Sequence, residues 1–160
     1  MRKLSGLSNK FMYVYFVVIG LFHLYTSVFG AYESYLQKNI HLGLVLPTAF
    51  FLFPMFKKAP MDRVPVYDWV LGALSAIPSI YVILNYDDIV MRIQQVDPLT
   101  AAQFWCGILL FVLLLEGTRR VVGLPLTIIA FLFGAYMYFG QSLPGIMKGL
   151  SFSMSEVVEQ

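Results

Sequence analysis

Five long stretches of the chain carry almost no charged side chains, and they constrain the fold more than any other feature. We expect helices at about residues 11–32, 39–56, 66–86, 98–116 and 121–142. Each stretch has about the 20 residues that a helix needs to cross the hydrocarbon core of a bilayer. Lipid offers no partners to backbone groups, so a spanning segment must satisfy its own hydrogen bonds. The sequence predicts an all-α integral membrane protein with five transmembrane helices in a single membrane domain, residues 1–160.

The composition indicates a protein surrounded by membrane lipid, and it argues against a soluble domain and against a nucleic-acid-binding protein. Of the 160 residues, 59% are hydrophobic and 12% are charged, against about 25% charged in soluble domains. The net charge of +2 is spread along the chain, which argues against a nucleic-acid partner because such proteins cluster their basic residues. The single cysteine, Cys106, cannot form an internal disulfide. The first apolar stretch is longer than a signal peptide's, which favours a retained anchor, although a cleaved signal stays open.

The distribution of lysine and arginine predicts the orientation of the spans. Cytoplasmic loops of membrane proteins carry the excess of these residues. With the N-terminus inside, five crossings place only Lys38, Arg92 and Lys148 outside. The residues that then fall on the cytoplasmic side are Arg2, Lys3, Lys10, Lys57, Lys58, Arg63, Arg119 and Arg120. We therefore expect a cytoplasmic N-terminus and a periplasmic C-terminus.

The connection between the third and fourth spans has the pattern of a short amphipathic helix on the outer surface. Its apolar side would be formed by Ile89, Val90, Ile93 and Val96. This spacing is typical of one helix face, although an ordinary polar loop is the alternative. Asp97 and Pro98 are placed to begin the fourth span. Beyond the last span, Ser153 and Glu156 have capping-box spacing and predict one more short helix.

The sequence contains no constellation typical of catalysis, a metal site or a cofactor site, so an enzyme is not expected. The ionisable residue nearest a span interior is Glu116, which can pair with Arg119 or Arg120 one turn later. His23 and His41 could in principle hold a haem between two helices. Their predicted depths differ, however, because His23 lies nine residues from the outer end of the first span, whereas His41 lies near the outer start of the second.

The segment Leu115–Gly149 resembles a family, and its first eleven residues, 115–125, read Leu-Glu-Gly-Thr-Arg-Arg-Val-Val-Gly-Leu-Pro. It is similar to the small, DctQ-like region of TRAP transporters, in particular the fused permeases of the TAXI branch, where such a segment precedes the last helix of the small region. Asp68-Trp69 and the segment 84–87, Leu-Asn-Tyr-Asp, also look like that family. The resemblance covers about residues 60–150, and the first two spans match in hydropathy alone.

The resemblance implies a scaffold subunit in the bacterial inner membrane. In that family a large, DctM-like permease subunit holds the substrate and sodium sites, and an extracytoplasmic substrate-binding protein delivers organic acids for symport. Substrate ligands therefore belong to the large subunit, and none is expected here. The residues that match the motif are Glu116, Thr118, Arg119, Arg120, Gly123 and Pro125, which we expect to order the cytoplasmic turn between spans four and five or to contact the partner.

Two points remain open at the level of sequence. The family's small region is often fused to the large subunit, so this chain is either a separate subunit or a fragment of a fused permease. A different class of function is a small channel or carrier that works alone as an oligomer. The scarcity of charge within the spans argues against it, because ion and proton paths need such groups. A membrane enzyme or electron-transfer anchor is the third alternative.

Overall fold

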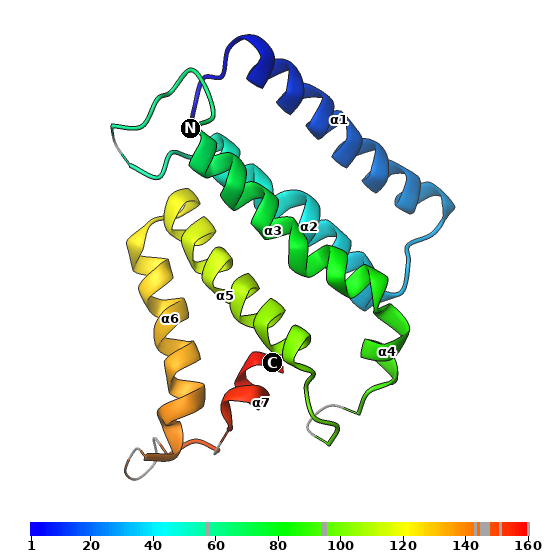
Figure 1. Cartoon of the computed structure of the whole chain (residues 1–160), viewed down its shortest axis with the longest axis vertical. Coiled ribbons are helices and arrows are strands. Elements are labelled where there is room, and N and C mark those ends of the chain that lie inside the picture. The colour runs from blue at the N-terminus through cyan, green and yellow to red at the C-terminus, as the bar shows by residue number, and fades with distance from the viewer. Residues whose placement is uncertain (57, 94–95, 143, 145–147, 151, 160) are drawn as a thin grey trace. The chain divides into compact units, whose positions relative to one another are not determined.

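The computed structural model describes residues 1–56, 58–93, 96–142, 144, 148–150 and 152–159, and all regular structure in these ranges is helical (Figure 1). The chain divides into two compact units, residues 1–86 and 87–160, which are described separately. The helices are α1 (Gly6–Phe29), α2 (Ser34–Leu52), α3 (Val66–Leu84), α4 (Tyr86–Met91), α5 (Ala101–Val121), α6 (Leu124–Phe139), the 3-10 helix η1 (Gly140–Ser142) and α7 (Met154–Glu159).

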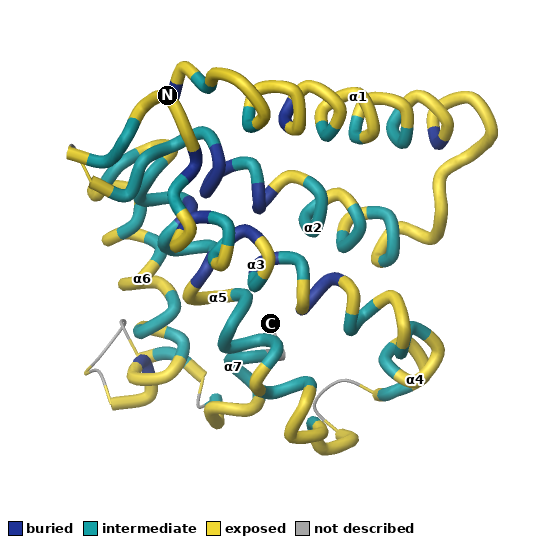
Figure 2. Tube along the Cα trace, turned by 45° about the horizontal axis from the view of Figure 1, so that its top comes forward, coloured by how far each residue is buried: buried dark blue, intermediate teal, exposed yellow. Residues whose placement is uncertain are grey.

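Four of these helices are long and apolar enough to cross a membrane, judged by length and composition. They are α1, α3, α5 and the helical segment Leu124–Ser142, which combines α6 and η1. Most of their apolar side chains are exposed, as Figure 2 shows for α1. Water is a poor medium for such surfaces, so these helices indicate a multi-pass membrane protein. α2 has 19 residues, but Gln37, Lys38, Asn39 and His41 make its first half polar and leave it outside this group.

Small residues allow α2 and α3 to pack closely in the first unit. A Cβ added to Gly43 of α2 would lie 2.5 Å from the Cβ of Ser79 on α3. The side chain of Asn39 also donates to the backbone oxygen of Ser79, at 3.0 Å. Close approach at small residues is the usual basis of helix association in lipid. The two helices therefore form a tight antiparallel hairpin, which Figure 2 shows beside α1.

α1 joins this hairpin through aromatic contacts at its N-terminal end. The rings of Phe11 and Trp69 have centroids 4.8 Å apart, and the Tyr15 hydroxyl donates to the Leu44 backbone oxygen at 2.9 Å. Met12, Phe51 and Val64 form the buried core at this end of the unit. At the opposite end, the Tyr86 hydroxyl donates to the Glu33 carboxylate at 3.1 Å. α1 and α3 thus run in one direction and α2 in the other.

In the second unit, α5 and α6 form an antiparallel hairpin and α7 packs against both. Gly107 of α5 makes room for α7, since a Cβ added there would lie 2.4 Å from Val158 Cγ1. The predicted capping box of α7 is confirmed. The Ser153 amide donates to the Glu156 carboxylate at 2.6 Å, and the Glu156 amide donates to the Ser153 hydroxyl at 3.3 Å.

The connection after α3 differs from the predicted amphipathic helix. Ile89 and Val90 lie in α4, but the helix ends at Met91, so Ile93 and Val96 lie outside it. The carboxylate of Asp97 accepts a hydrogen bond from the Ile93 amide at 2.8 Å. This bond offers the backbone an alternative to helix continuation. The four apolar side chains therefore do not share one helical face.

The helix of the fourth predicted span, α5, begins at Ala101, three residues later than expected. Asp97 and Pro98 precede α5 and do not cap it. Thr100 is the N-cap: its hydroxyl accepts from the Gln103 amide at 3.3 Å, while the Gln103 side chain accepts from the Thr100 amide at 2.9 Å. α5 then continues to Val121, so the segment Glu116–Arg120 belongs to its last turns and not to the turn after it.

Candidate functional site

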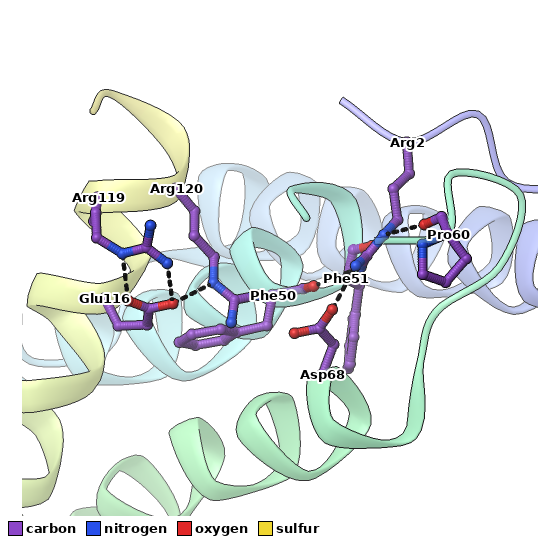
Figure 3. A network of polar contacts seen from close by, with 8 residues as sticks. All are labelled: Arg2, Phe50, Phe51, Pro60, Asp68, Glu116, Arg119 and Arg120. Atoms are coloured by element: carbon purple, nitrogen blue, oxygen red, sulfur yellow. Dashed lines mark hydrogen bonds and ion pairs between the residues drawn. The ribbon is translucent and has the colours of Figure 1, made fainter. Parts of the chain in front are cut away.

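The predicted ion pair at the end of α5 is present. Both Arg119 and Arg120 donate to Glu116, from one turn further along the helix (Figure 3). Arg119 Nε lies 2.7 Å from Oε2 and Arg119 Nη2 lies 2.8 Å from Oε1, which makes a two-point contact. Arg120 Nε adds a third bond of 2.7 Å to Oε1. Cations near a helix C-terminus are also favoured by the helix dipole, so the cluster stabilises the end of α5.

The other residues of the motif build a turn of only two residues between α5 and α6. The Thr118 backbone oxygen accepts from the amides of Val122 and Gly123, at 2.9 and 3.2 Å. Gly123 has a φ of 110°, a conformation that side-chain-bearing residues rarely adopt. Pro125 occupies the first turn of α6, where its missing N–H breaks no helical bond. All six motif residues therefore lie together at the end of α5 and the start of α6, and the Gly123 backbone oxygen also accepts from the Thr127 hydroxyl of α6 at 3.0 Å.

A second polar cluster, which the sequence analysis did not predict, ties the N-terminus to the α2–α3 hairpin. The Arg2 side chain is fully buried and donates to Asp68 Oδ2, with which it forms an ion pair. It also donates to the backbone oxygens of Phe50, Phe51 and Pro60, at 3.1, 3.0 and 3.2 Å (Figure 3). We call this group the Arg2 clamp.

The Arg2 clamp lies between two helix ends with opposite partial charges. Its guanidinium donates to the backbone oxygens of Phe50 and Phe51 at the negative end of α2, where the last carbonyls lack helical partners. Asp68 lies in the first turn of α3, at a positive end. A backbone hydrogen bond of 2.7 Å from the Arg2 amide to the Leu52 oxygen also holds the N-terminal segment against the end of α2. The clamp fixes where the chain enters α1, how α2 ends and how α3 begins.

The two histidines lie side by side, which corrects the prediction that they lie at different depths. His41 Nδ1 and His23 Nε2 are 3.1 Å apart. The structural bounds explain the difference, because His23 lies six residues before Phe29 at the end of α1, and His41 lies seven residues after Ser34 at the start of α2. At 1.5 Å per residue the two histidines lie about 9 Å and about 10.5 Å from those helix ends.

Comparison with protein-family models, with curated proteins and with solved structures finds no match. The assignment of function therefore depends on the clusters described above, on the apolar helices and on the resemblance carried by residues 115–125.

Proposed function

We propose that the chain is the small, DctQ-like scaffold subunit of a TAXI-type TRAP transporter in the bacterial inner membrane. In this role it supports a DctM-like permease subunit, which takes up organic acids with sodium after delivery by an extracytoplasmic substrate-binding protein. The observation that carries the proposal is the segment Glu116–Pro125, whose residues match the family motif and lie together at the turn between α5 and α6.

The contacts of that segment favour a structural role for this chain. Glu116 accepts all three hydrogen bonds described from Arg119 and Arg120, and Asp68 pairs with Arg2. Charged groups at the ends of the apolar helices are thus engaged in ordering helix termini. A scaffold needs rigid helix ends and exposed apolar faces, whereas substrate and ion binding would be supplied by the partner.

The arrangement within the first unit supports the proposed five crossings. The hydrogen bond from the Ser5 amide to the Asp62 oxygen, 2.9 Å long, places the start of α1 beside the α2–α3 connection. If α1 and α3 both cross in the same direction, the chain must return between them along α2. The polar first turns of α2 would then lie at the outer interface, with Lys38 reaching toward the headgroups.

Affinity purification from mild detergent, followed by mass spectrometry, tests the proposal. We expect the tagged chain, expressed in its native host, to retain a polytopic membrane protein of transporter size in a one-to-one ratio. Glu116→Gln, which removes the charge shared by both arginines, should reduce this recovery. Asp88→Asn is the matched control, because it makes the same acid-to-amide change at an exposed residue of α4, and it should leave recovery unchanged.

A chain that purifies alone or only with copies of itself would contradict the scaffold proposal. Reconstitution into liposomes then tests the alternative of a small channel or carrier. Uptake of organic acid by the purified chain without any partner would favour that alternative, and the scaffold proposal expects no uptake.

A further inference from the structure

The His23/His41 pair is a polar contact between two helices, α1 and α2. The two nitrogens that face each other, His23 Nε2 and His41 Nδ1, are 3.1 Å apart. The chain contains only these two histidines, and they are 18 residues apart in sequence. Neutral imidazole nitrogens are common ligands of transition-metal ions.

The separation of the two nitrogens matches that of neighbouring ligands on one metal ion. A metal–nitrogen bond is about 2.0–2.1 Å long. Two such ligands lie about 2.9 Å apart at a right angle and about 3.4 Å apart at the tetrahedral angle. Ligands on opposite sides of an ion, such as the axial ligands of a haem, would lie about 4.1 Å apart by the same bond length. The observed 3.1 Å fits neighbouring ligands and is too short for opposite ones.

The surroundings of the pair supply oxygen atoms from the same two helices. Gln37 lies one turn before His41 on α2, and Thr26 lies one turn after His23 on α1, so all four side chains share the α1–α2 interface. Gln37 Nε2 and Thr26 Oγ1 are 3.4 Å apart, at the limit of a hydrogen bond. Gln37 Oε1 is buried and has no hydrogen-bond partner in the part of the chain that the structure describes. A buried acceptor of this kind requires a partner, which can be a water molecule or an ion.

We propose that His23 and His41 together bind one divalent transition-metal ion of the Zn²⁺ class between α1 and α2. We expect the buried Oε1 of Gln37, whose Nε2 contacts Thr26 between the same two helices, to complete the site directly or through water. An ion held by one ligand from each helix links α1 to the α2–α3 hairpin. This site does not depend on the proposed transporter function, and failure of either proposal leaves the other intact.

Binding requires a simple change of protonation in the pair. In the metal-free state one of the facing nitrogens carries a proton and donates a hydrogen bond to the other, which accepts it. Both facing nitrogens must present lone pairs to the ion. The donor ring therefore moves its proton to its other nitrogen, and the total charge of the two imidazoles does not change.

Isothermal titration with Zn²⁺ alone tests the site, with the full chain in detergent micelles. The chain should carry a tag without histidine, and Cys106→Ser should be present throughout so that a thiol does not compete. We expect one Zn²⁺ per chain. Loss of groups that only orient a metal ligand already weakens binding by about 10- to 100-fold, so His23→Gln and His41→Gln should each weaken it at least tenfold. The double variant should bind at least as weakly as either single variant, because it removes both imidazole ligands.

Wild-type affinity in either single variant or in the double variant would overturn the proposal. Far-ultraviolet circular dichroism and gel filtration establish that each variant is folded. X-ray absorption at the zinc edge gives a second test that needs no variant. It should show two imidazole ligands on the bound ion, and a spectrum without imidazole scattering would also overturn the proposal.

Discussion

Arg2 and Asp68 form a buried ion pair, and the chain depends on both partners because neither is accessible to water. Asp68→Asn keeps the shape of the side chain but leaves the guanidinium buried without an opposite charge. Removing one partner of such a pair costs about 3–5 kcal/mol. We expect the midpoint of thermal unfolding in detergent to fall accordingly, because the clamp joins the N-terminus to the end of α2 and the start of α3.

Asp62→Asn is the matched control for this prediction. Asp62 is exposed, and the bond that it accepts from the Ser5 amide reaches its backbone oxygen and not its side chain. We expect this variant to unfold at the wild-type temperature. Equal stability of Asp68→Asn and Asp62→Asn would show that the pair contributes nothing.

The sequence could predict local pairs of side chains but not distant ones. Glu116 and its arginines are three and four residues apart in a helix, so their contact follows from helical geometry. Arg2 and Asp68 are 66 residues apart, and their contact depends on how the α2–α3 connection folds back on the N-terminus. The available signal was an acidic residue at the start of an apolar span, which needs a partner there.

Among the helices, the approach of α2 to α3 depends on a residue without a side chain. Gly43→Ala would place a Cβ 2.5 Å from the Cβ of Ser79. This is closer than two non-bonded carbon atoms can approach, so the two side chains would clash. The helices must separate, and overpacking of this kind costs about 1–3 kcal/mol. We expect a lower unfolding temperature in detergent.

Gly20→Ala is the control, because a Cβ at Gly20 of α1 would meet nothing within 4 Å. Alanine is favoured over glycine in a helix by about 1 kcal/mol, so this variant should be as stable as the wild type or more stable. A loss of stability in Gly20→Ala that equals the loss in Gly43→Ala would exclude the packing explanation.

The N-terminus of α2 is stabilised by a carboxylate whose titration can be followed. Partial desolvation raises the pKa of Glu33, but hydrogen bonds from the Leu36 and Tyr35 amides and from the Tyr86 hydroxyl outweigh it, so the pKa lies below its ordinary value. The stabilisation is therefore complete above the ordinary glutamate pKa. It is lost as the pH falls through the lowered value, because the protonated carboxyl is a weaker acceptor.

Nuclear magnetic resonance of the chain in micelles tests the direction of the Glu33 pKa shift. The amide signals of Tyr35 and Leu36 should move in acid with a midpoint below that of an unstructured glutamate. Glu33→Gln should remove the transition. A midpoint above the ordinary glutamate value would mean that desolvation dominates at this helix end.

Hydropathy predicted the existence of the long helices better than their ends. The second span was expected to begin at residue 39, yet α2 begins at Ser34, since the Glu33 carboxylate accepts from the Tyr35 and Leu36 amides there at 2.8 and 3.3 Å. Polar residues such as Gln37 and Lys38 are tolerated in this first part of the helix. The same shift of helix ends brings His23 and His41 to one depth, which hydropathy could not show.

For the whole molecule, the number of crossings depends on α2, because its polar first half distinguishes it from the four apolar helices. Lys38 lies near its start, and Lys58 lies in the connection that follows its end. If α2 crosses the membrane, these two positions lie on opposite sides. If α2 lies along the surface, a thiol reagent should reach both from one side.

Single cysteines at these positions, introduced into a Cys106→Ser background, separate the two arrangements. With a membrane-impermeant maleimide, we expect Lys38→Cys to react in right-side-out vesicles and Lys58→Cys to react in inside-out vesicles, because the excess of basic residues should lie in the cytoplasm. Asp88→Cys and Lys148→Cys should behave like Lys38→Cys, since an odd number of crossings leaves both positions outside. Reaction of Lys38→Cys and Lys58→Cys from the same side would show that α2 does not cross and would reduce the five crossings to four.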